Sequence, residues 1–330
     1  MAFLFLNKLG KNIKGLVTRI ESKDYYIHLP ETQKIIRCGL RGKFKKDFNL
    51  KKDKLYSTGI VVVGDKIEFD LNEDGTGIIH KVEKRKNYLS RKAPKIKGSS
   101  TRGERLEQVI ASNIDNFFII TSIKKPKFNN KVLDRLLVAG ESSHLNIIII
   151  INKKDLDDNS EIEFWHSLYS SIGYKVIATS KISREGIANV KDNLDGKKNL
   201  FWGQSGVGKS SLLNSMFQHL DLNVGEISSY SEKGKHTTVT SKMIKIDENT
   251  FIIDTPGIRE IDPYGIRKED LGHYFIEFKK YLIECRFNTC THQHEPGCAV
   301  IKAVENDKIS MQRYDSYLRI LETIEEDIIF

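Results

Sequence analysis

One short segment limits the possible folds of this chain more than any other feature. Residues 203–210 read GQSGVGKS, which fits the phosphate-binding pattern G-x-x-x-x-G-K-[ST]. An apolar stretch precedes the segment, and a stretch with helical periodicity follows it. Glycines allow backbone N–H groups to turn inward around a phosphate, and the start of the following helix adds positive charge. The sequence therefore predicts a P-loop that joins a strand to a helix in an α/β domain.

The predicted P-loop is accompanied by groups that suit a nucleoside triphosphate with Mg²⁺. Lys209 would place its cation on the β- and γ-phosphates, and Ser210 would offer its hydroxyl to Mg²⁺. Asp254 ends the apolar stretch FIID and is predicted to hold Mg²⁺ through water, while the amide of Gly257 contacts a γ-phosphate. The predicted nucleotide-binding residues of the P-loop are Gly203, Gln204, Ser205, Gly206, Val207, Gly208, Lys209, Ser210 and Ser211.

Residues 234–240, GKHTTVT, lie between these two motifs and are polar and glycine-containing, as a nucleotide-dependent switch needs to be. One threonine of this segment is predicted to complete the Mg²⁺ shell, and we favour Thr238 over Thr237 and Thr240. Hydrolysis would release the segment that follows DTPG, because the contact with the γ-phosphate is then lost.

A second motif bears on the choice of base. Asn152, Lys153, Lys154 and Asp155 follow the apolar run NIIIII directly. A carboxylate at Asp155 that accepts from N1–H and the 2-amino group selects guanine over adenine, since an unpaired buried acceptor costs about 1–3 kcal/mol. Asn152 would tie this loop to its neighbours, and the stem of Lys153 would cover one face of the base. Ser180, after the next predicted strand, would lend its backbone amide to the guanine O6, and together these elements favour a GTPase over an ATPase.

The order of these motifs is unusual. GTPases normally run from the P-loop through the switch threonine and DxxG to NKxD and the serine loop. Here NKKD and TSK precede GQSGVGKS, HTT and DTPG, so the set is complete but rotated, in the order G4-G5-G1-G2-G3. Such a circular permutation is feasible because domain termini usually lie close together at the surface. The rotation joins the segment after DTPG directly to the C-terminal part of the chain.

The remaining sequence predicts a multidomain α/β protein. Its N-terminal part consists of short apolar runs, with hairpins expected at Gly64–Asp65 and Asp74–Gly75, and predicts a small β-barrel of the OB type. Lys, Arg, Gly and Ser then dominate, after which strands alternate with helices. The predicted domains are an OB-fold barrel over 1–85, a basic linker over 86–108, a circularly permuted GTPase domain over 109–265 and a zinc-binding helical domain over 266–330.

Cysteines cluster near the C-terminus, which points to a metal site rather than to disulfide bridges. Cys285, Cys290 and Cys298 with His292 supply three thiolates and an imidazole, the donor set of a closed, tetrahedral, structural Zn²⁺ site. One such ion per chain is expected. The spacing does not distinguish His292 from His294 as the fourth ligand.

The charge balance favours a polyanionic partner. Lys and Arg number 53 against 44 Asp and Glu, which gives a net charge of +9. The predicted barrel, the basic linker and this charge together suggest RNA that is bound mainly through its phosphates. No apolar run approaches the roughly 18 residues of a membrane span, so a cytoplasmic protein without a membrane partner is expected. Basic side chains predicted to contact RNA are Arg37, Arg41, Lys43, Lys45, Lys46, Arg102 and Arg105.

These motifs together resemble the RsgA (YjeQ) family of circularly permuted, ribosome-assembly GTPases, over essentially the whole chain. The resemblance rests on the rotated motif order and on GKHTTVT, GQSGVGKSSLLN, DTPGIRE and CRFNTCTHQHEPGC. It implies a monomeric enzyme that slowly hydrolyses GTP to GDP and phosphate, with the bound small ribosomal subunit and its rRNA stimulating the reaction. It further implies a role late in maturation of that subunit, alongside other assembly factors, with nucleotide state controlling binding and release. Among the two histidines, it implies His292 as the zinc ligand.

The position after DTPG bears on the hydrolysis step. Many GTPases carry a glutamine there that orients the attacking water, whereas this chain carries Ile258. A low intrinsic rate is therefore expected, with the catalytic polar group supplied from elsewhere. The resemblance points to His236 in the switch; from the residues alone, a surface histidine in a loop is the alternative. Family members commonly read HTTT at this place, where this chain reads HTTV.

Two other functions remain open from the sequence. One is an RNA-binding assembly factor in which the nucleotide site acts only as a switch with negligible turnover, and the other is a metabolic P-loop kinase. Intact Lys209, Ser210 and Asp254 disfavour the first, and NKKD disfavours the second. Measured GTP turnover and nucleotide selectivity distinguish the three functions.

Overall fold

The computed structural model describes residues 11–42, 57–93, 107–217, 241–254 and 261–324. The chain divides into two compact units, each assembled from three separate stretches of sequence. We name the first the barrel unit and the second the helical unit. The barrel unit contains Met1–Asn116, Leu194–Phe201 and Leu222–Ile258, and the helical unit contains Phe117–Asn193, Trp202–Asp221 and Arg259–Phe330.

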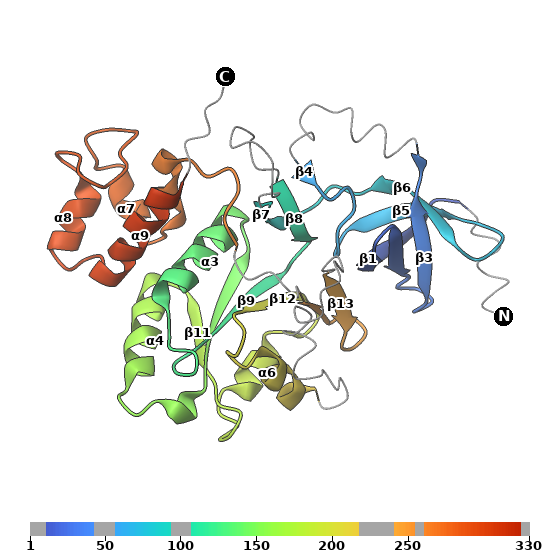
Figure 1. Ribbon diagram of the computed structural model, residues 1–330, viewed down its shortest axis with the longest axis horizontal. Coiled ribbons are helices and arrows are strands. Elements are labelled where there is room, and N and C mark those ends of the chain that lie inside the picture. The colour runs from blue at the N-terminus through green and yellow to red at the C-terminus, as the bar shows by residue number, and fades with distance from the viewer. Residues whose placement is uncertain (1–10, 43–56, 94–106, 218–240, 255–260, 325–330) are drawn as a thin grey trace, which may run out of the picture. The chain divides into compact units, whose positions relative to one another are not determined.

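Five strands close a barrel in the first unit, drawn in blue in Figure 1. They are β1 (Ile13–Glu21), β2 (Asp24–His28), β3 (Ile35–Leu40), β5 (Lys66–Leu71) and β6 (Gly77–Val82). Their order is β1-β2-β3-β6-β5, and β5 pairs back with β1 to close the barrel. Only the β3–β6 pair is parallel among these strands. Fully buried Ile27, Ile67, Phe69 and Ile79 fill the interior, so the predicted OB-type barrel is confirmed.

The predicted turn at Asp74–Gly75 joins β5 to β6 as an antiparallel hairpin. Gly75 has φ +82°, a left-handed conformation that glycine adopts without a steric penalty. Asn72 donates its backbone N–H to the carbonyl of Thr76 at 2.8 Å, which closes the turn. This hairpin is therefore set by local sequence alone.

The hairpin predicted at Gly64–Asp65 is wrong. In the described part of the chain β5 pairs with β1 and β6, and not with the residues just before Gly64, as a hairpin at this place would require. The N–H of Gly64 donates to the Val17 carbonyl at 2.9 Å, and its φ is +93°. A Cβ at this position would lie 2.0 Å from the carbonyl oxygen of Ser112. Glycine is required here because two backbone segments that are distant in sequence cross closely. In the local sequence, a Gly-Asp pair with this cause has the same pattern as a hairpin turn.

A second, three-stranded sheet in the barrel unit has the order β4-β8-β7. It consists of β4 (Ser57–Thr58), β7 (Tyr88–Lys92) and β8 (Glu107–Ser112). β7 lies inside the segment 86–108 that the sequence predicts to be a linker. Leu89 of β7 is 1% exposed and pairs with Ala111 of β8. This apolar contact stabilises a strand in a segment whose composition is dominated by charged residues.

Three further strands belong wholly or mainly to the barrel unit: β12 (Lys198–Gly203), β13 (Lys242–Lys245) and β14 (Phe251–Asp254). β13 and β14 form an antiparallel hairpin, and β13 pairs with barrel strand β1. β14 runs parallel to β12, with Asp254 opposite Phe201. The boundary between the units thus crosses the segment 109–265, which the sequence assigns to a single domain.

Strands and helices alternate in the helical unit, as the sequence predicts. The strands have the order β11-β10-β9, and β10 and β11 are parallel. The five consecutive isoleucines of β10, Ile147–Ile151, are all buried, as expected for a central strand covered on both faces. The elements are β9 (Asn116–Ser122), α3 (Asn130–Ser142), β10 (Asn146–Asn152), η2 (Lys154–Leu156), α4 (Glu161–Ile172), β11 (Lys175–Ala178), α5 (Ile187–Asp192) and α6 (Lys209–Met216).

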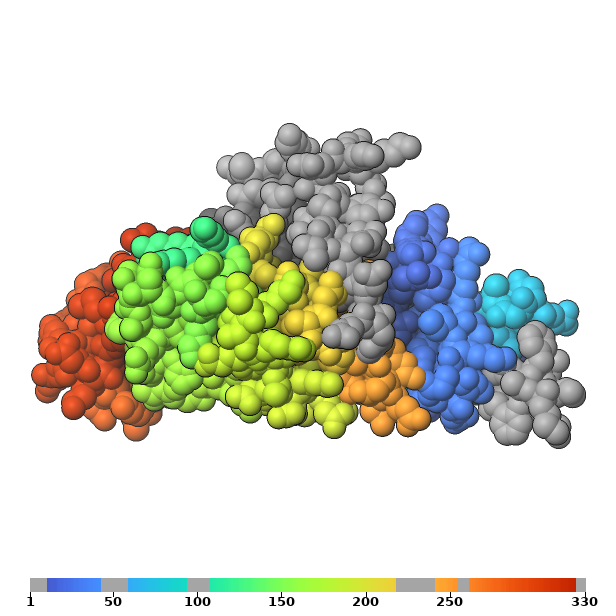
Figure 2. Space-filling view, turned by 90° about the horizontal axis from the view of Figure 1, so that it is seen from below, coloured from blue at the N-terminus to red at the C-terminus, as the bar shows by residue number. Residues whose placement is uncertain are grey.

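The C-terminal residues are helical and share a core with α3. Phe275, Phe278 and Tyr317 are fully buried in this core, and Val138 of α3 joins the same cluster. Figure 2 shows the red C-terminal residues lying directly against the green residues of the α3–α4 region. These helices, like every other described helix, are too short or too polar to cross a membrane. The elements are η4 (Lys268–Tyr274), α7 (Lys279–Leu282), α8 (Ala299–Glu305) and α9 (Met311–Thr323).

A buried ion pair fastens α9 to α3. Arg313 of α9 donates to Asp134 of α3 at 2.5 Å and to Glu277 at 2.7 and 3.1 Å. Asp134 is fully buried and also accepts from the Tyr169 hydroxyl of α4 at 2.7 Å. Burial lowers the pKa of Arg313, but Asp134 and Glu277 outweigh this effect and raise it well above the ordinary value. One charged arginine therefore connects α9, α3 and the η4–α7 segment.

Arg313→Met should lower the free energy of unfolding of the helical unit by about 3–5 kcal/mol, because it leaves buried carboxylates without their cation. Both tryptophans of the chain, Trp165 and Trp202, lie in this unit, so denaturant unfolding followed by tryptophan emission reports the change. The control is Arg319→Met on the same helix, whose ion pair with Asp315 is exposed and should contribute little. Equal effects of the two substitutions would contradict the prediction.

Candidate nucleotide and metal sites

The P-loop forms a turn that only glycine permits at two places. β12 ends at Gly203 and α6 begins at Lys209. Gly206 and Gly208 have φ values of +82° and +96°, where other residues are strained. A Cβ at Gly208 would also lie 2.4 Å from the side-chain nitrogen of Asn152. The glycines thus allow the P-loop to approach the NKKD turn closely.

Asn152 joins the NKKD turn to the P-loop. It is 4% exposed at the end of β10, and its Nδ2 donates to the carbonyl of Val207 at 2.9 Å. Its Oδ1 accepts from the hydroxyl of Thr179 at 3.0 Å, at the end of β11. The two ends of one buried amide therefore connect three loops, as the sequence suggested for this residue.

Lys153 adds a second connection between the same two turns. Its Nζ donates to the carbonyl of Gly206 at 2.6 Å and to that of Lys125. Burial lowers the pKa of Lys153, although the nearby Asp155 carboxylate opposes this shift. The Lys153 side chain thus extends from the NKKD turn to the backbone of the P-loop.

Asp155, the predicted guanine acceptor, is exposed and held in position by Ser180. The Ser180 hydroxyl donates to Oδ1 of Asp155 at 2.5 Å and accepts from the N–H groups of Ile182 and Ser183 at 3.1 and 3.2 Å. Sequence reasoning gave Ser180 only a backbone amide role and missed this orienting role of its side chain. A serine just after the end of β11 predicts a loop. That its hydroxyl contacts Asp155 becomes apparent only in the folded structure.

The structure places the remaining predicted residues as follows. Lys209, Ser210 and Ser211 occupy the first turn of α6, and Asp254 is buried at the end of β14. His236, Thr238 and Gly257 lie outside the described residues, as do Ile258, Lys43, Lys45, Lys46, Arg102 and Arg105.

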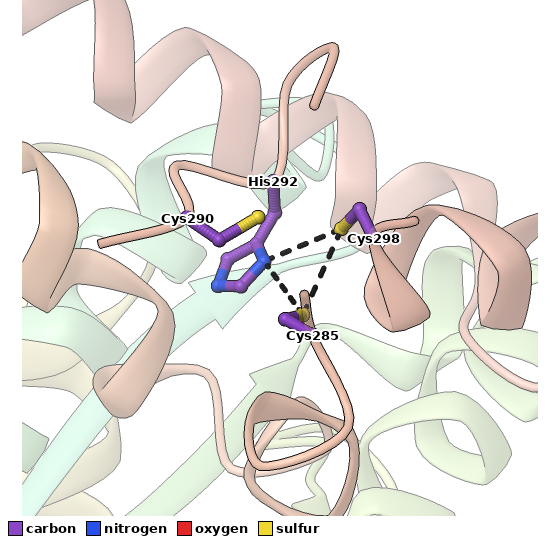
Figure 3. Close-up of side chains that lie close together, drawn as sticks. All are labelled: Cys285, Cys290, His292 and Cys298. Atoms are coloured by element: carbon purple, nitrogen blue, oxygen red, sulfur yellow. Dashed lines mark hydrogen bonds between the residues drawn. The ribbon is translucent and has the colours of Figure 1, made fainter. Parts of the chain in front are cut away.

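The four predicted metal ligands come together in the C-terminal part (Figure 3). The ligand atoms of Cys285, Cys290, His292 and Cys298 all lie within 4.8 Å of one another. Nδ1 of His292 is 3.4 Å from Sγ of Cys298 and 3.6 Å from Sγ of Cys285. His294 is exposed, so the structure resolves the choice between the two histidines. A cluster of three cysteines and one histidine at this separation can hold a metal ion.

Hydrogen bonds fix the loop that carries His292. Glu295 accepts from the N–H and hydroxyl of Thr291 at 2.6 and 2.5 Å and from the N–H groups of Gln293 and His294. Burial tends to raise the pKa of Glu295, but the hydrogen bonds from Thr291 and the other donors dominate and lower it to about 2. The hydroxyl of Tyr314 on α9 donates to the carbonyl of His292 at 2.8 Å. These hydrogen bonds fix the backbone that carries the His292 imidazole.

A closed barrel, a P-loop tied to an NKKD turn, and a rotated motif order define a circularly permuted GTPase with an N-terminal OB-type domain. Comparison with known families agrees with this class. Residues 14–79 match the RsgA N-terminal domain, and residues 82–264 match the RsgA GTPase. The chain belongs to the RsgA GTPase family, and its activity is GTP hydrolysis.

Relatives match along nearly the full length. The small ribosomal subunit biogenesis GTPase RsgA of Bacteroides fragilis is 37% identical over 317 residues, which cover 95% of this chain and 98% of that protein. The protein of the same name from Chlorobaculum parvum is 36% identical, covering 96% of this chain and 100% of the relative.

Two solved structures share the fold. YjeQ from Thermotoga maritima superposes with a TM-score of 0.71 at 32% identity, covering 94% of this chain and 97% of that one. YloQ, described as a circularly permuted GTPase, gives a TM-score of 0.67 at 26% identity, covering 94% and 93%. The barrel, permuted GTPase and C-terminal parts of the predicted fold are therefore confirmed.

Asn152→Ala should weaken GTP binding at least about tenfold, because it leaves the Val207 carbonyl and Thr179 hydroxyl without their partner, at about 1–3 kcal/mol each. Equilibrium titration with a fluorescent GTP analogue measures the effect. Asn159→Ala removes the same amide from an exposed loop position and serves as the control. Equal affinity of the two variants would show that this tie does not organise the nucleotide site.

Proposed function

We propose that this chain hydrolyses GTP on the small ribosomal subunit and thereby assists a late step in maturation of that subunit. The observation that carries the nucleotide part is the contact of Asn152 and Lys153 with the P-loop backbone. The ribosomal part is supported by the names of curated relatives that match almost the whole chain. Intact Lys209, Ser210 and Asp254 count against a site without turnover.

The proposed nucleotide contacts follow from the motifs and their geometry. Asp155 accepts from guanine N1–H and the 2-amino group, with the amide of Ser180 on O6. Lys209 and the P-loop amides bind the phosphates, and Gly257 contacts the γ-phosphate. For Mg²⁺, which GTPase chemistry requires, we assign Ser210, Thr238 and Asp254 from the motifs alone.

The proposed partners are GTP or GDP, the small subunit with its rRNA, and other assembly factors. The side chain of Arg37 on β3 is 61% exposed, although it pairs with Asp24 at 2.9 Å. Such exposed cations suit RNA phosphates, and the net charge of +9 adds long-range attraction. We propose that the protein acts as a monomer in the cytoplasm.

The central experiment measures GTP hydrolysis by the purified chain with and without purified small subunits. We expect slow turnover alone, marked stimulation by subunits, and no use of ATP. Lys209→Ala is the inactive control, because it removes the cation from the β- and γ-phosphates. Absence of stimulation would refute the ribosomal part of the proposal, and equal use of ATP would refute the base assignment.

His236→Ala should abolish most of the subunit-stimulated rate while leaving GTP affinity nearly unchanged. The reason is that Ile258 cannot orient the attacking water, so a polar group of the switch has to do so. Single-turnover hydrolysis with and without subunits measures the difference. The role is discarded if the variant is stimulated as strongly as the unmodified chain.

We also propose that the cluster of Figure 3 holds one structural Zn²⁺ per chain. Cys290→Ser should abolish zinc binding and lower the unfolding temperature, because the ion would join the segment after α7, the His292 loop and the residue just before α8. Cys38→Ser changes a buried cysteine of the barrel and should retain the ion. Elemental analysis of both variants measures zinc; retention of a full equivalent by Cys290→Ser would oppose the assignment.

A further inference from the structure

A groove borders the open edge of the sheet in the helical unit. β11 (Lys175–Ala178) ends this sheet, and in the described part of the chain it has a neighbour, β10, on one side only. Along its other edge lies a cavity of about 920 Å³, lined by all four residues of the strand. α4 contributes one wall and α5 the other. Of the NKKD turn only Lys154 lines this groove, and no residue of the P-loop or of the metal cluster does.

The backbone of β11 faces the groove at Val176. Thr179 donates its N–H to the Ile151 carbonyl of β10 at 2.9 Å. Because backbone groups alternate in direction along a strand, the N–H and C=O groups of Ala178 and Val176 point away from β10. Gly186, which precedes α5, approaches the Ala178 carbonyl so closely that a Cβ would lie 2.1 Å from it. The start of α5 therefore covers the Ala178 end. At Val176, which is 9% exposed, no described residue hydrogen-bonds to the outward N–H and C=O groups.

Four carboxylates, of Asp157, Glu163, Glu185 and Asp192, and two lysines, Lys154 and Lys175, line the groove, in a chain whose net charge is +9. Lys154 pairs with Glu185, and Lys175 donates to a side-chain amide oxygen at 2.6 Å. Glu163 on α4 and Asp192 on α5 are exposed, and neither has a hydrogen-bond or ion-pair partner among the described residues. Each wall thus presents one of these exposed carboxylates.

We propose that this groove binds an extended segment of a partner protein that contains lysine or arginine and adds as a strand to β11. Hydrogen bonds to the exposed edge provide affinity, and alternate side chains provide specificity. Successive side chains of an added strand point to opposite faces, so they reach the α4 wall at Glu163 and the α5 wall at Asp192 in turn. The four residues of β11 match a segment of roughly 13 Å.

Charge decides among the possible occupants. A nucleic acid would bring its phosphates into a groove where carboxylates outnumber lysines four to two. A second copy of this chain, paired edge to edge, would bring the same carboxylates against themselves. A basic peptide is the occupant that gains from both carboxylates.

The test uses the full chain and a fluorescein-labelled peptide of alternating lysine and valine, with binding followed by fluorescence anisotropy. We expect binding together with slower hydrogen exchange in fragments that cover 175–178. A peptide of the same charge but with alternate peptide nitrogens methylated should bind at least about tenfold more weakly, because it cannot complete a strand ladder. Equal binding of both peptides, or protection elsewhere in the chain, would overturn the proposal.

Charge variants provide the matched comparison. Glu163→Gln with Asp192→Asn should weaken binding at least about tenfold. Glu305→Gln with Glu322→Gln removes the same charge from exposed positions of α8 and α9, and should change binding less than about twofold. GTP turnover should be unchanged in both, so a failure here is separable from failure of the proposed GTPase role. Equal weakening by the two pairs, or a dimer that forms through β11 in sedimentation, would refute the peptide site.

Discussion

The nucleotide site depends on one buried amide. Asn152 holds the turn after β10 against the turn before α6, and it is supported by a glycine that leaves space for its side chain. Asn152 of the NKKD turn and Val207 of the P-loop are 55 residues apart in sequence, yet this contact fixes the separation of the two turns. Catalytic geometry in such a domain depends on which strand ends meet at the edge of a sheet, and not on the order in which the chain visits them.

Rotation of the motifs changes what the switch is attached to. β14 ends at Asp254 in the barrel unit, and the structure next describes the chain from Ile261 onward in the helical unit. Asp262 is held by Arg135 of α3 at 3.1 Å. Only residues 255–260, which contain most of DTPG, separate these two anchored points. A change of nucleotide state at this motif therefore acts on a short connection whose ends belong to different units.

Features with a local cause could be predicted from the sequence. Examples are the glycines of the P-loop, the isoleucine run of β10 and the spacing of Cys285 to Cys298. In each case the residues that determine the structure lie close together in the sequence. The barrel followed from alternating apolar runs and the Asp74–Gly75 turn. The role of Gly64 could not be predicted, because its cause is the backbone of Ser112. The side-chain role of Ser180 and the buried Arg313 network depend in the same way on partners far along the chain.

The contact between α3 and α9 has a consequence for synthesis of the protein. Asp134 and Arg313 are separated by 179 positions. At about 5–20 residues per second, the carboxylate would emerge from the translating ribosome roughly 9–36 s before its cation. Throughout that delay α3 would carry an uncompensated charge and an uncovered Val138. Completion of this part of the protein is thus coupled to the last helix to be translated, and a prematurely terminated product would present a face that chaperones and proteases recognise.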